Sequence, residues 1–246
     1  MSRAAGAVAR RLGRPELLAA VDADARQALL ESVGVRASLV SALPPDGTYV
    51  DVGTNRGQVL SDAVRVAPRG RHIAFEPIPA LAAEVASTFP TVDCRRLALA
   101  AERGVAQFCH FRKLDGWSGL RRSPAISDER GAPEYITVEV STLDTELDGI
   151  TPDVVKVDVE GAELGVLEGG RTVLARARPV VILEHVSAAS ELYGVTSQAL
   201  WELLDDLDYQ LFAVSGEGPF GRSDFARERR VVNWLARPAT ASGASS

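Results

Sequence analysis

Residues 48–57 read Thr48-Tyr49-Val50-Asp51-Val52-Gly53-Thr54-Asn55-Arg56-Gly57, and this stretch decides the fold. The run 48–52 is short and largely β-branched or aromatic, so it predicts a strand. Gly53 allows a tight turn after it, and Gly57 allows close packing where a helix over 57–67 begins. A strand that passes through a glycine turn into a helix is typical of doubly wound α/β folds, in which ligands bind beyond the carboxyl ends of the strands.

Strands and helices alternate along most of the remaining chain. We expect strands at 71–75, 92–99, 104–111, 136–140, 154–159 and 180–184, and helices at 79–88, 162–175 and 197–207. Two extended runs at 209–214 and 231–236 suit an antiparallel pair. This alternation indicates a mostly parallel sheet that is covered by helices on both faces.

The chain has 246 residues, of which 46% are hydrophobic, so it can bury a full core. Apolar residues at helical spacing predict an N-terminal helical segment within 1–43. One α/β domain is expected over 44–237. Small and polar residues predict a flexible C-terminal tail at 238–246.

Charge and cysteine usage narrow the class of protein. The net charge is −6 and lysines and arginines form no long run, so we expect no nucleic-acid partner. Cys94 and Cys109 lack metal-ligand spacing and are expected to be reduced thiols. The N-terminus has no apolar run of the length that a signal peptide or membrane span needs, so we expect a cytoplasmic protein with no membrane partner. A homodimer is compatible with the sequence.

Acidic residues end four of the predicted strands, at Asp51, Glu76, Asp158 and Glu184. Charged side chains are costly in buried parallel strands, so their convergence at one edge of the sheet indicates a ligand site. Asp51 before the glycine turn suits a ligand with a cationic end, such as S-adenosylmethionine. The glycine that a dinucleotide's pyrophosphate requires at the middle of G-x-G-x-x-G is absent.

Four stretches, in register, resemble the motifs of the FkbM family of methyltransferases. They are Asp51-Val52-Gly53-Thr54-Asn55-Arg56-Gly57, Phe75-Glu76-Pro77-Ile78-Pro79, Ser141-Thr142-Leu143-Asp144 and Val155-Lys156-Val157-Asp158-Val159-Glu160-Gly161-Ala162-Glu163. Residues 167–169 and 179–184 continue the pattern. The similarity covers more than half of the chain, from about 48 to 184.

The resemblance implies a class I, Rossmann-like methyltransferase domain over 44–237, with a seven-stranded, mostly parallel sheet whose last strand is antiparallel. It implies S-adenosylmethionine as cofactor and O-methylation of a hydroxyl on a sugar, polyketide or other small metabolite. The cofactor site that it implies comprises Asp51, Gly53, Asn55, Gly57, Glu76, Pro77 and Ala98, with Glu76 at the ribose. The sequence departs from the family at Arg96, where an Asn is common, and at Trp117-Ser118-Gly119, where a Ser-Ser pair is common.

An alcohol has a pKa on the order of 15, so methyl transfer to it needs a nearby base or a metal. Asp158, Glu160 and His185 are the candidate catalytic residues, and His185 suits a base near neutral pH. A divalent cation such as magnesium, held by Asp158, Glu184 and His185, is the alternative. We favour the metal-free route because a hard cation usually wants more oxygen ligands than two acids offer.

The polar stretch 114–133 is expected to be a mobile loop that contacts the acceptor. Trp117 would stack on a sugar face, with Ser118 beside it, and Arg121 would contact a carboxylate or phosphate. Two other functions stay open at this point: a nucleotide-cofactor oxidoreductase, and a methyltransferase-like scaffold without turnover. The buried acids argue against the scaffold, which need not bear the cost of burying them.

Overall fold

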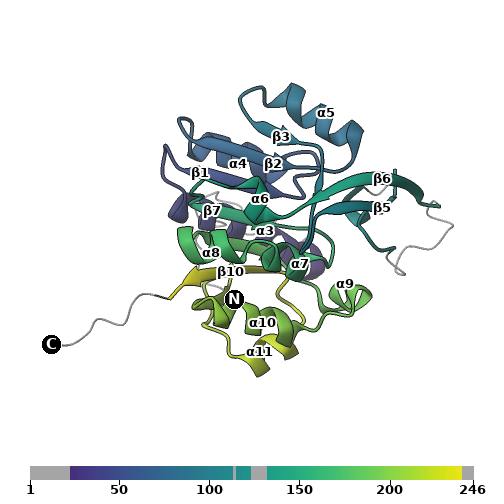
Figure 1. Cartoon of the computed structure of the whole chain (residues 1–246). Coiled ribbons are helices and arrows are strands. Elements are labelled where there is room, and N and C mark those ends of the chain that lie inside the picture. Colours follow the sequence, from purple (N-terminus) through teal and green to yellow (C-terminus); the bar gives the residue numbers. More distant parts are fainter. Residues whose placement is uncertain (1–22, 113–114, 123–131, 240–246) are drawn as a thin grey trace.

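The computed structural model describes residues 23–112, 115–122 and 132–239 (Figure 1). It has the predicted α/β architecture. The main sheet has seven strands in the order β3-β2-β1-β7-β8-β10-β9. Their bounds are β1 Thr48–Val52, β2 Arg71–Phe75, β3 Asp93–Arg95, β7 Val154–Val157, β8 Val180–Glu184, β9 Tyr209–Ala213 and β10 Asn233–Pro238. Strand β10 is antiparallel to both neighbours, whereas β3, β2, β1, β7 and β8 pair in parallel, as predicted.

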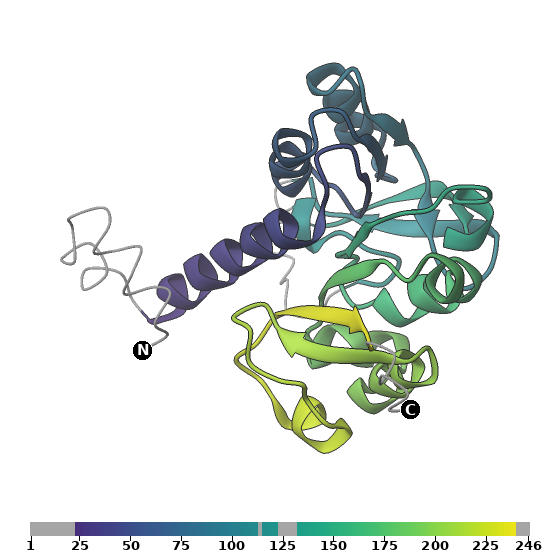
Figure 2. The same cartoon turned by 90° about the vertical axis from the view of Figure 1, so that its left-hand side faces the viewer.

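Helices cover both faces of this sheet, and the alternation of side chains along β1 shows how. Val50 and Val52 point to one core cluster, and Tyr49 points to the other. The first cluster packs under α6 Leu143–Glu146, α7 Glu163–Glu168, α8 Arg171–Ala177 and α10 Ser197–Asp206. The second packs under α3 Ala23–Ala42, α4 Gln58–Val66 and α5 Pro79–Thr88. Figure 2 shows α3 running from the body of the domain toward the N-terminal end.

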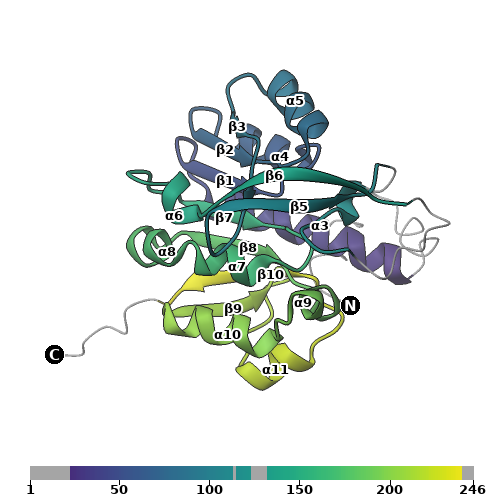
Figure 3. The ribbon, with the colours of Figure 1, turned by 45° about the vertical axis from the view of Figure 1, so that its right-hand side comes forward.

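A second, three-stranded sheet has the order β4-β6-β5, with β4 Ala98–Leu99, β5 Gly104–His110 and β6 Glu134–Ser141. The prediction of one strand over 92–99 was therefore wrong. The chain turns after β3, where Leu97 N donates to Arg95 O, and residues 98–99 pair with β6 instead of β2. The β5–β6 pair projects from one side of the main sheet (Figures 1 and 3).

The predicted helix over 162–175 is also divided, at Gly169 and Gly170, into α7 and α8. A Cβ at Gly169 would lie 2.2 Å from Ala100 O, so these two segments of the chain can pack together only because residue 169 is a glycine. Asp144 caps the second helix, since its carboxylate accepts Thr172 N at 3.0 Å and Val173 N at 2.7 Å. Asp144, the last residue of the family-like stretch 141–144, therefore has a structural role in this chain.

Further short elements, unpredicted from the sequence, complete the described part. They are the 3₁₀ turns η1 Asp115–Trp117 and η3 Glu191–Tyr193 and the helices α9 Ser187–Ser190 and α11 Arg222–Arg227. Several predicted features lie wholly or partly outside the described residues: 1–22 of the N-terminal segment, 114 and 123–131 of the acceptor loop, and 240–246 of the tail, together with residue 113. No helix in the described ranges is long and apolar enough to cross a membrane.

Candidate active site

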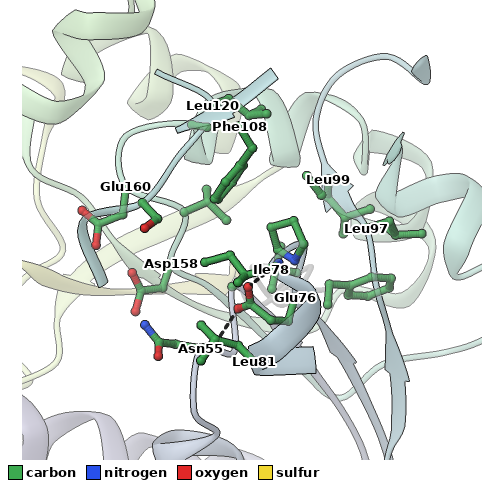
Figure 4. A pocket seen from close by; sticks show the side chains of 18 of the residues that line it. Asn55, Glu76, Ile78, Leu81, Leu97, Leu99, Phe108, Leu120, Asp158 and Glu160 are labelled. Atoms are coloured by element: carbon green, nitrogen blue, oxygen red, sulfur yellow. Dashed lines mark hydrogen bonds between the residues drawn. The ribbon is translucent and has the colours of Figure 1, made fainter. Parts of the chain in front are cut away.

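A cavity lies at the carboxyl ends of β1, β2 and β7, where the fold predicts a ligand (Figure 4). It holds about 690 Å³ of empty space, part of which is open solvent. Its wall is formed by Val52, Gly53, Asn55, Phe75, Glu76, Pro77, Ile78, Leu81, Leu97, Ala98, Leu99, Phe108, Gly116, Ser118, Leu120, Asp158, Val159, Glu160 and Ala162.

The turn after β1 forms the floor of the cavity. Gly53 has a φ of 78°, and a Cβ there would lie 1.9 Å from Asp158 O, so both its backbone conformation and its surroundings require glycine. Asn55 also has a positive φ, of 51°. Gly57 does not line the cavity: it precedes α4 with a φ of 75° and packs against Phe89.

Glu76, directly after β2, is buried and lines the cavity. Asn55 N donates to its Oε2 and Ile78 N donates to its Oε1, both at 2.9 Å. Figure 4 shows the first of these bonds as a dashed line. Two backbone donors therefore fix the orientation of this carboxylate, and a fixed carboxylate at the end of the second strand is the group that accepts ribose hydroxyls in doubly wound folds.

The side of the cavity next to Glu76 is apolar. Leu97 directly precedes β4, which Ala98 and Leu99 form, and Ile78 and Leu81 lie at the start of α5. A flat aromatic ring fits such a wall. Of this run, only Ala98 was expected at the site from the sequence, because the flanking Leu97 and Leu99 have the composition of a buried strand.

Asp51, Lys156 and Asp158 form a charge cluster across the ends of β1 and β7, in which Asp51 and Lys156 are buried and Asp158 is partly exposed. The backbone register pairs Asp51 with Lys156, whose Nζ lies 3.0 Å from Asp158 Oδ2 and 3.6 Å from Asp51 Oδ1. Burial would lower the pKa of Lys156, but the charges of Asp158 and Asp51 outweigh it and raise the pKa. Asp51 also accepts a bond from Thr54 Oγ1 and is not part of the cavity wall, whereas Asp158 is.

Glu160 enters the cavity from the turn between β7 and α7. Its φ is 55°, unusual for a residue with a side chain, and Gly161 follows with a φ of 102°. Glu163 Oε1 accepts Gly161 N at 2.9 Å and so holds this turn. Burial raises the pKa of Glu160 to about 8, and the charge of Asp158 adds to the effect. A carboxyl group with this pKa can take a proton near neutral pH.

His185 is not part of the cavity wall. Its Nε2 lies 2.9 Å from Ser197 Oγ, its Nδ1 lies 3.2 Å from Ser190 Oγ, and its ring packs on Phe225 with centroids 5.1 Å apart. Burial, with a contribution from Arg229, lowers its pKa to about 4. The position directly after β8 suggested a base near neutral pH, but the side chain turns away toward α10 and is uncharged there.

The three expected acceptor residues lie in different surroundings. Ser118 is buried, lines the cavity and accepts Phe111 N at 3.0 Å. Trp117 is 46% exposed, and Arg121 is exposed with its backbone N bonded to Tyr193 Oη at 3.1 Å. Only Ser118 of the three is part of the described cavity wall.

The structure thus brings eight of the expected site residues to one cavity: Gly53, Asn55, Glu76, Pro77, Ala98, Ser118, Asp158 and Glu160. It places five outside the wall: Asp51, Gly57, Trp117, Arg121 and His185. Among the described residues, no group of three or more His, Cys, Asp or Glu side chains could hold a metal ion. Neither Phe108, which lies in β5, nor Leu120, which lies within the predicted acceptor loop, was singled out from the sequence.

Comparison with known proteins identifies relatives of this chain. Residues 51–211 match the family described as the methyltransferase FkbM domain. The 2-O-methyltransferase NoeI of Sinorhizobium fredii is 30% identical over 168 aligned positions, covering 60% of this chain and 67% of that protein. The methyltransferase sdnD of Sordaria araneosa is 29% identical over 162 positions, covering 53% of this chain and 62% of that protein.

Among solved structures, a methyltransferase FkbM from Methylobacillus flagellatus is similar with a TM-score of 0.49 and 16% sequence identity. The match covers 79% of this chain and 44% of that chain. This chain thus spans less than half of that protein.

Proposed function

Because this chain belongs to the FkbM family of S-adenosylmethionine-dependent methyltransferases, we propose that it methylates a hydroxyl oxygen of a sugar, polyketide or other small metabolite. One observation carries the proposal: the charged residues on the described cavity wall, Glu76, Asp158 and Glu160, are all acidic. Such a wall suits a cationic methyl donor and repels the pyrophosphate of a nicotinamide dinucleotide. The family and the charges together argue against the oxidoreductase alternative.

The wall fits S-adenosylmethionine in three ways. Glu76, held by two backbone donors, would bind the ribose hydroxyls, with Pro77 beside it. The apolar side at 97–99, including Ala98, would hold the adenine ring. The glycine turn at Gly53 and Asn55 would leave room for the methionine part, because no Cβ stands at position 53.

S-adenosylmethionine supplies a methyl group on a positively charged sulfur, which leaves as a neutral thioether when the acceptor oxygen bonds to the methyl carbon. The chain's residues then have two tasks. They must align the acceptor oxygen with the methyl group, which can contribute several kcal/mol. They must also receive the proton that the hydroxyl loses, since a protonated oxonium product is unfavourable.

We assign Glu160 as the base that accepts the proton of the acceptor hydroxyl. Figure 4 shows Glu160 and Asp158 on one side of the cavity, with Phe108 and Leu120 nearby and Leu97 and Leu99 at the other side. Asp158 is already engaged by Lys156, so Glu160 is better suited to accept the proton. Asp158 would instead keep a negative charge close to the sulfonium. The apolar pair Phe108 and Leu120, with Ser118, would contact the acceptor.

An acceptor oxygen, rather than nitrogen or carbon, is supported by the name of the Sinorhizobium fredii relative, a 2-O-methyltransferase. The test is a transfer assay with methyl-labelled S-adenosylmethionine and a panel of neutral methyl glycosides, hydroxylated macrolides and their amino and phosphorylated analogues. We expect label on an oxygen of a neutral acceptor, located by NMR of the product. Label on nitrogen or carbon would overturn the choice of atom. Cofactor binding with no transfer to any member would favour the scaffold.

A further inference from the structure

One short stretch, residues 118–121, closes the cavity on the side of Glu160. Ser118 and Leu120 line the cavity, and Leu120 packs against the cluster that contains Phe108 and Ile78. The stretch is tied to β5 by an isolated bridge, in which Cys109 N donates to Gly119 O at 2.8 Å and Gly119 N donates to Cys109 O at 3.1 Å. The bonds between Gly119 and Cys109 of the second sheet therefore hold this stretch over the cavity.

Tyr193, at the end of η3, ties the same stretch to the main domain. Its hydroxyl accepts Arg121 N at 3.1 Å, across 72 positions of sequence. A Cβ at Gly119 would lie 3.2 Å from this hydroxyl and 3.6 Å from Glu160 Cβ. The tyrosine hydroxyl, the backbone of Gly119 and the side chain of Glu160 are thus immediate neighbours.

The segment that carries Tyr193 is itself anchored to the turn of Glu160. A Cβ at Gly161 would lie 2.4 Å from Ala189 O, so α9 packs directly on this turn. Ser190, the last residue of α9, is bonded to His185 at the end of β8. Burial raises the pKa of Tyr193 to about 12, and the nearby charges of Glu163 and Glu160 add to the shift. The hydroxyl therefore stays protonated and neutral beside the acids.

We propose that Tyr193 is a positioning residue, whose hydroxyl holds residues 118–121 against the Glu160 turn and so keeps the acceptor end of the cavity closed around the carboxylate. The inference rests on the proposed function for its consequence, because the closed end matters if Glu160 serves as base. The bond itself can be tested without an acceptor. Loss of the hydroxyl would free the Arg121 amide and admit water to Glu160.

The test compares the wild-type chain with Tyr193→Phe, and with Tyr209→Phe as the matched control, because the Tyr209 hydroxyl also bonds to the backbone, at Pro179 O (3.0 Å), but lies outside the cavity wall. Amide exchange by NMR reports the Arg121 N–H directly. A neutral hydrogen bond contributes about 1 kcal/mol, so we expect exchange about fivefold faster in Tyr193→Phe. The Glu160 carboxyl, followed by carbon-13 NMR and assigned by its loss in Glu160→Gln, should titrate at lower pH, because water reduces the cost of its charge.

Calorimetry with S-adenosylhomocysteine separates the two proposals. We expect its affinity in Tyr193→Phe to stay within about twofold of wild type, as in the control. Gly119→Ala, whose new methyl group would lie 3.2 Å from the hydroxyl and push it by a few tenths of an ångström, should shift both measurements in the same direction. An unchanged Arg121 exchange rate or an unchanged Glu160 midpoint would overturn the inference, as would faster exchange throughout the chain, which indicates a purely structural role. A wild-type chain that fails to bind S-adenosylhomocysteine would contradict the proposed function instead.

Discussion

Glu160 combines a backbone and a side chain that are each unusual. Its left-handed φ of 55° costs energy in a residue with a Cβ, and such strain is often found at functional sites. The conformation aims a carboxylate into a cavity in which Glu76 and Asp158 are also acidic. Burial and the charge of Asp158 favour the protonated form, so the group is poised to exchange a proton near neutral pH.

We expect Glu160→Gln to lower turnover by roughly 10²- to 10⁴-fold, because the amide cannot accept the hydroxyl proton. Steady-state kinetics with the acceptor found by the panel measures this loss. The affinity for S-adenosylhomocysteine should change little, since the base acts on the acceptor. Glu102→Gln, an exposed site outside the cavity, serves as the control. A fully active Glu160→Gln would remove this residue from the mechanism.

The pH dependence of turnover follows from the same pKa. A base must be deprotonated, and the pKa of Glu160 is raised to about 8, so turnover should rise as pH increases through about 8. His185 cannot produce this rise, because its lowered pKa of about 4 leaves it neutral throughout that range. Turnover that is constant from pH 6.5 to 9 would contradict the assignment.

At the level of elements, the site depends on the register between β1 and β7. That register places Asp51 opposite Lys156, and Lys156 in turn holds Asp158 at the cavity wall. Removal of one partner from a buried ion pair leaves an uncompensated charge. Lys156 is therefore a structural requirement of the site, although its ammonium does not line the cavity.

Lys156→Met should reduce the free energy of unfolding by about 3–5 kcal/mol, because Asp51 and Asp158 would lose their common partner. Chemical denaturation measures the change. Arg36→Met removes the cation of an exposed pair with Asp62 and should cost less than about 1 kcal/mol. If both variants lose the same small amount, the charge cluster does not contribute as described.

Much of the element pattern was accessible from the sequence, and the exceptions have physical causes. The glycine turn after β1 predicted the first strand and helix because local chemistry determines both. The break between β3 and β4 arises because residues 98–99 pair with β6 and not with β2, and this long-range pairing cannot be read from the local sequence. The division of α7 from α8 depends on the contact of Gly169 with Ala100, which is equally non-local.

The site was predicted where motif and strand end coincide, as at Gly53, Glu76 and Asp158. It was missed where distant chain segments meet. Phe108, Leu120 and Tyr193 have no distinctive pattern, and the second sheet brings the first two to the cavity. His185 illustrates the opposite error, because a strand end fixes the backbone position but not the direction of the side chain.

For the whole molecule, buried acids make stability depend on pH. Burial raises the pKa of Glu160 and Glu184, and the charge of Asp158 adds to both shifts. A raised folded pKa means that the folded state binds the proton more tightly than the unfolded state does. The resulting stabilisation is complete below the unfolded pKa of about 4.5 and is lost as pH rises through the folded pKa of about 8.

The melting temperature should therefore fall as pH increases from 6.5 to 8.5, and Glu184→Gln should flatten that decline. His185, whose lowered pKa destabilises the folded state only under acid conditions, does not contribute in this window. Calorimetric melting across the window measures both effects. Glu102→Gln should keep the wild-type slope. A melting temperature that rises over the window would show that these acids are ionised in the folded chain with no cost.

The central claim is that this cavity binds S-adenosylmethionine through Glu76, and one measurement tests it most directly. Isothermal titration should compare S-adenosylhomocysteine with NADH on the wild-type chain and on Glu76→Ala. We expect one site for S-adenosylhomocysteine, no site for NADH, and weaker binding in the variant by about 1–3 kcal/mol, the scale of a lost hydrogen bond to a charged group. Equal affinity for S-adenosylhomocysteine in both chains, or binding of NADH alone, would contradict the account.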